Sequence, residues 1–225
     1  STSNPRNLYD AKNFAASIGM KHIEIPIASF EAQMRENLLV NFAIKDSINT
    51  NELDNLRIGN FCARIRMAIL YDFSLANHSL VIGTSNKSEI LLGYGTIFGD
   101  LAYAINPIGG LFKSEIFALA KVLGIPQEII DKPPSADLFE NQSDEADLGY
   151  SYKQIDAFLS AFEALLQKHN VKFSALNQKD YTDLVLVADE LEKMGFEKPF
   201  VVSLMRRILR NAFKSHLPKI FNSME

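Results

Sequence analysis

Residues 83–89 hold the densest group of chemically useful side chains in the sequence. They read Gly-Thr-Ser-Asn-Lys-Ser-Glu and directly follow the apolar run Leu-Val-Ile at 80–82. Ligands of parallel α/β sheets bind beyond the carboxyl ends of the strands, which is where this group would lie. Asn86 and Glu89 also have the spacing of a capping box at a helix start. The pattern is compatible with ligand binding and with helix capping.

Lys113 stands in the first turn of a helix predicted over about 112–123, which Gly124 ends. The helix dipole disfavours a cation at this end, so an anion is expected nearby. A bound anion would supply it, but pairing with Glu115 or plain solvation are the ordinary alternatives. The dipeptide Gly-Gly at 109–110 would let the backbone approach a phosphate closely, or would simply form a turn.

Asp100 and Arg64 are weaker candidates. Asp100 ends the glycine-punctuated stretch 93–100 and could be a turn carboxylate or a general base. Arg64 flanks the apolar stripe of a long predicted helix, where solvation at the surface is the ordinary role of an arginine. The four histidines, at positions 22, 78, 169 and 216, have neither metal-ligand spacing nor a Ser or Cys partner. Their spacing supports neither a zinc site nor a nucleophilic triad.

Composition limits the classes of protein that could carry these residues. The chain has 225 residues, of which 47% are hydrophobic, and its formal net charge of −4 shows none of the basic bias common among nucleic-acid and membrane-surface binders. Cys62 is the only cysteine, which excludes an intrachain disulfide and fits a reducing cytoplasm. Apolar runs are far shorter than the roughly 20 residues that cross a bilayer. We therefore expect a cytoplasmic protein with no nucleic-acid or membrane partner.

The elements that must position these residues alternate between helix and strand. Apolar spacing predicts helices over 5–18, 28–42 and 55–77, strands over 22–26 and 79–83, and a polar loop over 45–55. A loop with at most a short helix is expected over 127–150. Beyond it the chain reads as helix and turn, from a capping box at Ser151 and Gln154 to a basic helix over 201–213. This order predicts an α/β fold with a parallel sheet flanked by helices and a helical C-terminal part.

The first residues carry a further expectation. An α/β domain that opens on a helix lacks the strand that would ordinarily precede it, and Ser-Thr-Ser at 1–3 is similar to a loop leaving such a strand. We therefore expect the sequence to begin inside its domain.

Five segments together closely resemble the bacterial ammonia-dependent NAD synthetases, in the form found in epsilonproteobacteria. They are Arg-Ile-Arg-Met at 64–67, the stretch 83–89, Gly-Tyr-Gly-Thr-Ile-Phe-Gly-Asp at 93–100, Asn-Pro-Ile at 106–108 and Pro-Ser-Ala-Asp-Leu at 134–138. The resemblance covers essentially the whole chain and is densest over 59–150. It implies an adenine nucleotide α-hydrolase-like fold in one domain over 1–225, with an α/β nucleotide-binding part over 1–150 and a helical part over 151–225.

The resemblance also implies a reaction and a set of roles. The nicotinate carboxylate of deamido-NAD would be adenylated by ATP with Mg²⁺, and ammonia would then displace AMP to give NAD, with pyrophosphate as the other product. A homodimer paired through helices like 55–77 is implied as well. The roles that it implies are ATP binding by Thr84, Lys113 and Ser135, magnesium binding by Glu89, deamido-NAD binding by Arg64 and Lys214, and catalysis by Lys113 and by Asp100, which would hold ammonium or take its proton.

Two departures from the family pattern stand out. Ala104 occupies a position where the family often has an acidic substrate-binding residue, so the resemblance leaves the pose of the nicotinate half open and gives Ala104 no role. The family's Ser-Gly-Gly-x-Asp-Ser loop, which cradles pyrophosphate and supplies a second magnesium ligand, does not occur in residues 1–225. We expect it to lie upstream of this sequence, together with the missing strand.

Other functions remain as alternatives. Another ATP pyrophosphatase, such as a GMP or argininosuccinate synthetase, would share the nucleotide fold but not the Lys-Ser-Glu and Pro-Ser-Ala-Asp-Leu segments together. A glutamine-dependent NAD synthetase is disfavoured because these residues include no glutaminase domain. The alternative from another class is a non-catalytic dimerisation or dinucleotide-binding module.

Overall fold

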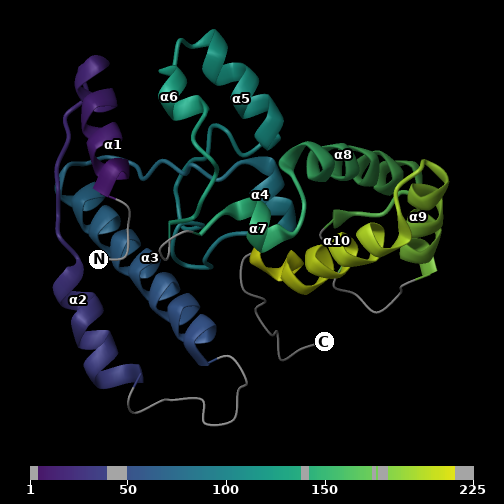
Figure 1. The fold of residues 1–225 in the computed structure, drawn as a ribbon, viewed down its shortest axis with the longest axis horizontal. Coiled ribbons are helices and arrows are strands. Elements are labelled where there is room, and N and C mark those ends of the chain that lie inside the picture. Colours follow the sequence, from purple (N-terminus) through teal and green to yellow (C-terminus); the bar gives the residue numbers. More distant parts are fainter. Residues whose placement is uncertain (1–4, 40–49, 138–141, 174–175, 177–181, 216–225) are drawn as a thin grey trace, which may run out of the picture. The chain divides into compact units, whose positions relative to one another are not determined.

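The computed structural model describes residues 5–39, 50–137, 142–173, 176 and 182–215, and most of these residues are helical (Figure 1). The helices are α1 (Pro5–Ser17), α2 (Ala28–Gln33), the π-helical turn η1 (Met34–Leu39), α3 (Thr50–Ala76), α4 (Lys87–Leu92), α5 (Lys113–Val122), α6 (Gln127–Ile130), α7 (Asp144–Leu148), α8 (Tyr152–Lys168), α9 (Thr182–Lys193), α10 (Lys198–Asn211) and the 3-10 turn η3 (Ala212–Ser215). None of them is both long and apolar enough to span a membrane.

The chain forms two compact units, each assembled from separate stretches of sequence. The first unit contains Ser1–Thr84, Thr96–Pro107 and Phe117–Tyr150, and the second contains Ser85–Gly95, Ile108–Ile116 and Ser151–Glu225. The candidate residues are divided between them: Arg64, Thr84, Asp100 and Ser135 belong to the first unit, and Glu89, Lys113 and Lys214 to the second.

Helix α3 is the longest element of the first unit, and the predicted helix over 55–77 is confirmed. Its apolar stripe repeats at intervals of three and four residues, which brings Ile58 and Cys62 to one face. There they pack with Met34 of η1 in a small core, against which the partly buried Ile27 and Phe61 are also packed. The predicted helix over 28–42 corresponds to α2 and η1, and its last residues lie outside the described part. Residues 45–49 of the predicted loop over 45–55 also lie outside it, but residues 50–55 are helical because α3 already begins at Thr50, so the loop prediction was wrong there.

The strand expected over 22–26 is not formed. These residues are neither helical nor paired as a strand, and Ile23 and Ile25 remain 48% and 50% exposed. A strand is stabilised by a neighbour that shares its backbone hydrogen bonds, and none of the described residues provides one here. The alternation of polar and apolar residues was therefore a misleading signal at this position.

The strand expected over 79–83 is reduced to one parallel bridge between Ile82 and Ile105. Around it the Val81 carbonyl accepts the backbone N–H of Ala104 at 2.9 Å, and the Gly83 N–H donates to the Ile105 carbonyl at 2.7 Å. Gly83 lies against the Tyr103 ring, and a Cβ at this position would collide with it. The described residues thus show parallel pairing directly before the 83–89 segment, but the predicted sheet remains a prediction.

The second unit is built around α8, α9 and α10, as the expectation of a helical C-terminal part requires (Figure 1). Ser151 and Gln154 form the predicted capping box at the start of α8. The buried side chains include Phe158 of α8, Leu191 of α9 and Ile208 of α10, each almost completely shielded from solvent. Phe158 also makes edge contacts with Phe196 and Phe200. This core supplies a rigid base for the short helix α4, which contacts α8 and α10.

Candidate functional site

Helix α4 begins with the capping box that the spacing of Asn86 and Glu89 predicted. The Asn86 side chain accepts the Glu89 backbone N–H at 3.0 Å, and the Asn86 backbone N–H donates to Glu89 Oε2 at 3.1 Å. Each residue therefore satisfies a helix-terminal N–H group that would otherwise lack a partner within α4. Gly93 ends the helix with a left-handed conformation at φ +60°. The capping alternative is realised, and it fixes the direction of the Glu89 carboxylate.

The other oxygen of Glu89 faces Lys113, the first residue of α5. Lys113 Nζ lies 3.0 Å from Glu89 Oε1, and the two side chains are only 19% and 16% exposed. The Lys113 ammonium also lies 5.1 Å from the centre of the Tyr152 ring, which adds a cation–π contact. Glu115 does not pair with Lys113 and instead accepts the Phe112 backbone N–H at 2.7 Å. Glu89 is therefore the anion that compensates Lys113 at the helix start.

Two residues hold the first turn of α5: Ser88, which the sequence reasoning quoted within 83–89 without a role of its own, and Asp156, which it missed. Ser88 Oγ accepts the Lys113 backbone N–H at 3.0 Å, and Asp156 Oδ2 accepts the Ser114 backbone N–H at 2.7 Å. Ser88 also donates its hydroxyl proton to Asp156 Oδ1. A signal for Asp156 was present, because this charged residue falls on the otherwise apolar buried face of α8, between Ile155 and Leu159.

Lys214, in η3, contacts the end of α4 rather than Glu89 or Lys113. Its Nζ donates to the Gly93 carbonyl at 2.8 Å and to the Gly95 carbonyl at 3.0 Å. The guanidinium of Arg207 lies 5.5 Å from the centre of the ring of Tyr94, which stands between those two glycines. The second unit thus brings Glu89 and Lys113 into direct contact and ties Lys214 to the same short helix.

Asp100 has the turn role that was one of its two alternatives. Its Oδ1 accepts the Thr96 backbone N–H at 2.8 Å, and the Thr96 hydroxyl donates to Asn60 Oδ1 of α3 at 2.6 Å. Gly99 packs closely against Thr96 and Ala63, where a Cβ would have no room without a shift of its neighbours. The Asp100 carboxylate is exposed, so this turn presents it to solvent.

The remaining candidates of the first unit are exposed. Arg64 lies on the outer face of α3, and Thr84 follows the parallel bridge. Ser135 Oγ accepts the Asp137 backbone N–H at 3.0 Å, which is a local turn contact. No hydrogen bond or ion pair described for the first unit joins any two of Arg64, Thr84, Asp100 and Ser135. Ala104 is exposed beside the bridge.

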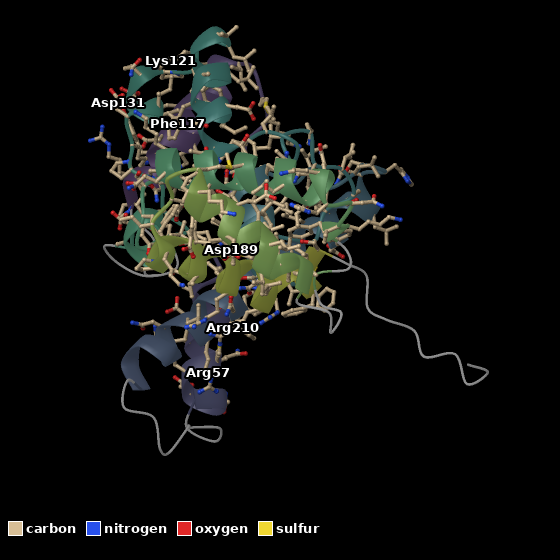
Figure 2. All side chains as sticks on the ribbon, turned by 90° about the vertical axis from the view of Figure 1, so that its right-hand side faces the viewer. Arg57, Phe117, Lys121, Asp131, Asp189 and Arg210 are labelled. Carbon is tan, nitrogen blue, oxygen red and sulfur yellow. The ribbon has the colours of Figure 1, made fainter. Side chains whose placement is uncertain are left out.

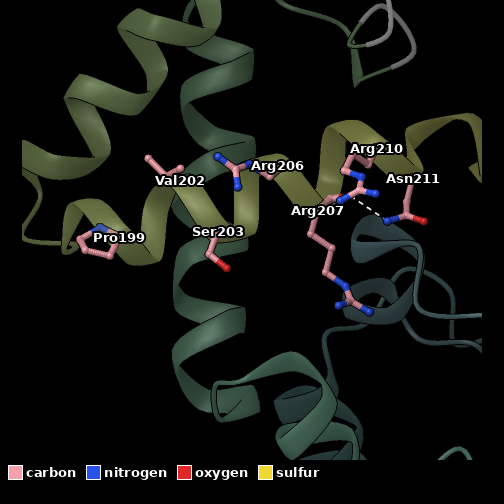
Figure 3. A pocket seen from close by; sticks show the side chains of 7 residues that line it. All are labelled: Pro199, Val202, Ser203, Arg206, Arg207, Arg210 and Asn211. Atoms are coloured by element: carbon pink, nitrogen blue, oxygen red, sulfur yellow. Dashed lines mark hydrogen bonds between the residues drawn. The ribbon is translucent and has the colours of Figure 1, made fainter. Parts of the chain in front are cut away.

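A groove of about 520 Å³ runs along α10 (Figure 3). It is lined by Pro199, Val202, Ser203, Arg206, Arg207, Arg210 and Asn211. Asn211 donates to the Arg207 carbonyl at 2.9 Å, the bond drawn in the close-up. None of the residues that the motifs single out lines this groove, so it is separate from the Glu89–Lys113 contact.

Comparison with known proteins decides the family. The sequence model of the family described as "NAD synthase" matches residues 1–218. The chain belongs to this family. The resemblance drawn from the five segments is therefore confirmed, and so is its epsilonproteobacterial character. The chain is 48% identical over 221 residues to the "NH(3)-dependent NAD(+) synthetase" of Helicobacter hepaticus, an alignment that covers 97% of this chain and 77% of the relative.

Solved structures related to this NAD synthase family member agree with the assignment. The NH3-dependent NAD synthetase of Campylobacter jejuni is 35% identical, with a TM-score of 0.68 over 99% of this chain and 74% of its own. The NMN synthetase of Francisella tularensis is 26% identical, with a TM-score of 0.73 over 98% of this chain and 75% of its own.

Glu89 is the residue of this NAD synthase family member that would suit a magnesium ion. Among the described residues no group of three or more His, Cys, Asp or Glu side chains could hold a metal ion. Mg²⁺ does not require such a group, since it is commonly bound by one or two carboxylates together with substrate phosphates and water. Glu89 offers a hard oxygen donor that is largely shielded and oriented by its cap. The donor chemistry of Glu89 fits magnesium, and the further ligands would have to be oxygens from elsewhere, such as substrate phosphates and water.

Proposed function

We propose that this protein catalyses the ATP-dependent amidation of deamido-NAD with ammonia, giving NAD, AMP and pyrophosphate. The observation that carries the proposal is the 48% identity, over 97% of the chain, to a relative named NH(3)-dependent NAD(+) synthetase. Among the alternatives raised by the sequence, a different ATP pyrophosphatase is not supported by this relationship.

The proposed chemistry has two steps. A carboxylate oxygen of the nicotinate group attacks the α-phosphorus of ATP, and the bond to the β-phosphate oxygen breaks, so pyrophosphate leaves. The nitrogen of ammonia then attacks the acyl carbon of the adenylate, and the bond to AMP breaks. Adenylation is needed because a free carboxylate has no good leaving group. Charge develops on the departing phosphates in the first step, and stabilising that charge is the largest task of the site.

Lys113 is suited to the phosphate role in this scheme. It lies in a largely shielded position, and its ammonium is held by Glu89 and the Tyr152 ring. A cation held in place before the reaction stabilises developing negative charge without reorganising at the moment of reaction. Thr84 and Ser135 would add hydroxyl donors to ATP, and both are exposed in the first unit.

Glu89 would hold Mg²⁺ together with oxygens of ATP. When bound, the ion would neutralise phosphate charge and favour the departure of pyrophosphate. Glu89 already accepts the Asn86 N–H and pairs with Lys113. We therefore expect one carboxylate to hold both the magnesium ion and Lys113.

The remaining roles concern deamido-NAD and ammonia. Arg64 and Lys214 would bind deamido-NAD, and the contact of Lys214 with the Gly93 and Gly95 carbonyls would bring its cation to the end of α4. Asp100 would hold ammonium or take the proton that nitrogen loses as it attacks. Its exposed carboxylate is anchored by Thr96, which leaves the group both oriented and accessible.

The assembly and architecture belong to the same proposal. We expect one domain over 1–225 with a parallel sheet, extending the pairing seen at Ile82 and Ile105. The protein would be a cytoplasmic homodimer paired through α3, on which several large apolar side chains are exposed, among them Leu70 and Phe73. Analytical ultracentrifugation tests the dimer, and a monomer at micromolar concentration would contradict it.

A product assay tests the reaction. The purified protein is incubated with deamido-NAD, ammonia, Mg²⁺ and ATP, and NAD, AMP and pyrophosphate are quantified. Equal amounts of the three products are expected, because each amide formed consumes one adenylate. Release of ADP and phosphate would contradict the adenylation scheme. If the protein bound deamido-NAD but formed no NAD, the non-catalytic module would be favoured instead.

A second candidate function has one observation in its favour. The solved structure named as NMN synthetase superimposes on this chain with a TM-score of 0.73. The corresponding reaction would amidate nicotinate mononucleotide, which has the same reacting carboxylate without the adenosine half. Running the assay with the mononucleotide in place of deamido-NAD separates the two, and we expect the dinucleotide to have the higher kcat/KM.

A further inference from the structure

We propose that Asp156 is a positioning residue that fixes the first turn of α5 and thereby sets the place of Lys113. The inference rests on the proposed function for the role of Lys113 in binding ATP. Asp156 lies in α8 and is 5% exposed. It acts through the backbone of α5 and through Ser88, and is not expected to contact a substrate.

The two oxygens of Asp156 join three helices. Oδ2 accepts the Ser114 N–H of α5 at 2.7 Å, and Oδ1 accepts the hydroxyl proton of Ser88 in α4. Ser88 in turn accepts the Lys113 N–H at 3.0 Å. The carboxylate of Asp156 therefore binds the second N–H group of α5 directly and the first one through the Ser88 hydroxyl. The same short helix carries Glu89, which holds the side chain of Lys113. Backbone and side chain of Lys113 are therefore both anchored from α4.

The electrostatics explain why an acid occupies this buried position. A buried carboxylate is costly unless its oxygens are hydrogen-bonded, and here both oxygens are. The start of a helix carries a partial positive charge, and the negative charge of Asp156 stabilises it. This charge also offsets the unfavourable position of a lysine in the first turn. A plain packing role would be better served by an apolar residue, like the neighbours of Asp156 on the buried face of α8.

The test measures the affinity for Mg–ATP, in the absence of deamido-NAD, by calorimetric titration. The proteins are the wild type, Asp156→Asn, Lys113→Met and the double variant. Asparagine keeps the shape of the side chain but has one acceptor oxygen and no charge. Each single change is expected to raise the Kd by about tenfold. If Asp156 acts through Lys113, the double variant should be little weaker than Lys113→Met alone.

Two further measurements separate positioning from general destabilisation. Hydrogen exchange of the Lys113 and Ser114 amides should accelerate in Asp156→Asn but not in Asp189→Asn, a matched change of an exposed acid on α9 (Figure 2). In steady-state kinetics Asp156→Asn should raise the KM for ATP. Its KM for deamido-NAD should stay within about twofold of the wild-type value. General destabilisation would not select one substrate.

The results can overturn the inference and the proposed function separately. The inference is overturned, even if the wild type makes NAD, by either of two results. One is an ATP affinity of Asp156→Asn equal to that of the wild type, and the other is a Kd of the double variant raised by the product of the two single-variant factors. A wild type that binds Mg–ATP and shows the coupling, but forms no NAD, overturns the proposed function and leaves the inference standing. A wild type that does not bind Mg–ATP overturns the inference.

Discussion

Lys113 and Glu89 face each other from the first turns of two helices, with Nζ 3.0 Å from Oε1. Glu89 has a second duty, because its Oε2 accepts the Asn86 backbone N–H that closes the capping box of α4. One carboxylate therefore both caps the start of a helix and orients a cation. The two duties respond differently to substitution, which allows them to be separated by experiment.

Replacing Glu89 by glutamine should preserve the cap and remove the charge. Glutamine is as suitable as glutamate at this position of a capping box, so the free energy of unfolding should change by less than about 1 kcal/mol. Turnover at saturating Mg²⁺ should fall by roughly 10²-fold, because a charged group of the proposed site is lost. Urea unfolding and NAD formation measure the two effects.

Ser151→Ala provides the matched control in the other capping box, that of α8. Loss of an N-cap hydroxyl should cost about 0.5–2 kcal/mol of unfolding free energy and leave turnover unaltered. If Glu89→Gln left turnover unaltered, as this control should, Glu89 would be a capping residue only.

Local sequence patterns predicted the parts of this fold that depend on neighbouring residues. The capping boxes at Asn86 and Ser151 and the long helix α3 all follow from spacings of three or four residues. The strand over 22–26 failed because a strand depends on a partner elsewhere in the chain, which local alternation does not reveal. The parallel pairing of Ile82 with Ile105 shows the same dependence on a partner.

The candidate site was predictable in the same limited way. Residue types marked Glu89 and Lys113 individually, but their contact spans 24 positions of sequence. It takes the place of the local pairing with Glu115, which was only one of the alternatives. Asp156 and Ser114 are 42 positions apart. Such contacts arise only when helices pack, so no spacing rule applies to them. The buried acid on the apolar face of α8 was the available hint.

Glu190 should make stability sensitive to acid. Its Oε2 accepts from Lys168 Nζ at 2.6 Å and its Oε1 lies 2.9 Å from His169 Nε2. The hydrogen bond from Lys168, assisted by the one with His169, lowers the pKa of Glu190 from its ordinary value of 4.5. The unfolded chain then binds this proton more readily than the folded protein does. The stabilisation that ionised Glu190 contributes is therefore present above its ordinary pKa and is lost as pH falls through its pKa in the folded protein.

Urea unfolding between about pH 6 and pH 3 tests this linkage. Glu190→Gln should be less stable than the wild type at the higher pH, and this difference in the free energy of unfolding should vanish at the lower pH. Asp189→Asn, which changes the adjacent exposed acid, should follow the wild type throughout. A constant difference across the range would mean that Glu190 does not titrate differently in the two states.

Cys62 should be slow to react and should weaken the fold in alkali. Burial within the small core, with a smaller effect of Glu31, raises the pKa of its thiol. A neutral, buried thiol reacts slowly with disulfide reagents, so modification of the folded protein at pH 8 should be at least about tenfold slower than in urea.

The sign of the pH effect at Cys62 follows from the raised pKa. As pH rises past the ordinary thiol value of 9.0, the unfolded chain loses its proton while the folded protein keeps it, and stability falls. In Cys62→Ala this part of the alkaline loss should be absent, even though removing the sulfur lowers stability at every pH. Parallel alkaline slopes for the two proteins would count against the raised pKa.

Gly93→Ala should be far more damaging than Gly149→Ala, although both glycines end a helix in the left-handed region, at φ +60° and +79°. A Cβ at Gly149 would have nothing within 4 Å, whereas one at Gly93 would collide with Asn211 Cβ and lie 2.9 Å from its Cγ. The conformational strain alone should cost about 1–2 kcal/mol at either site. Overpacking should add roughly 1–3 kcal/mol at Gly93, measured by urea unfolding.

The double change Gly93→Ala with Asn211→Gly identifies the collision as the cause. Removing the Cβ of Asn211 should recover part of the added loss, despite the lower helix propensity of glycine at the end of α10. Because Lys214 donates to the Gly93 carbonyl, Gly93→Ala should also raise the KM for deamido-NAD, and the double variant should lower it again. If Asn211→Gly gave no recovery of stability, the strain at Gly93 would have to lie in its backbone alone, and the two glycines would then respond alike.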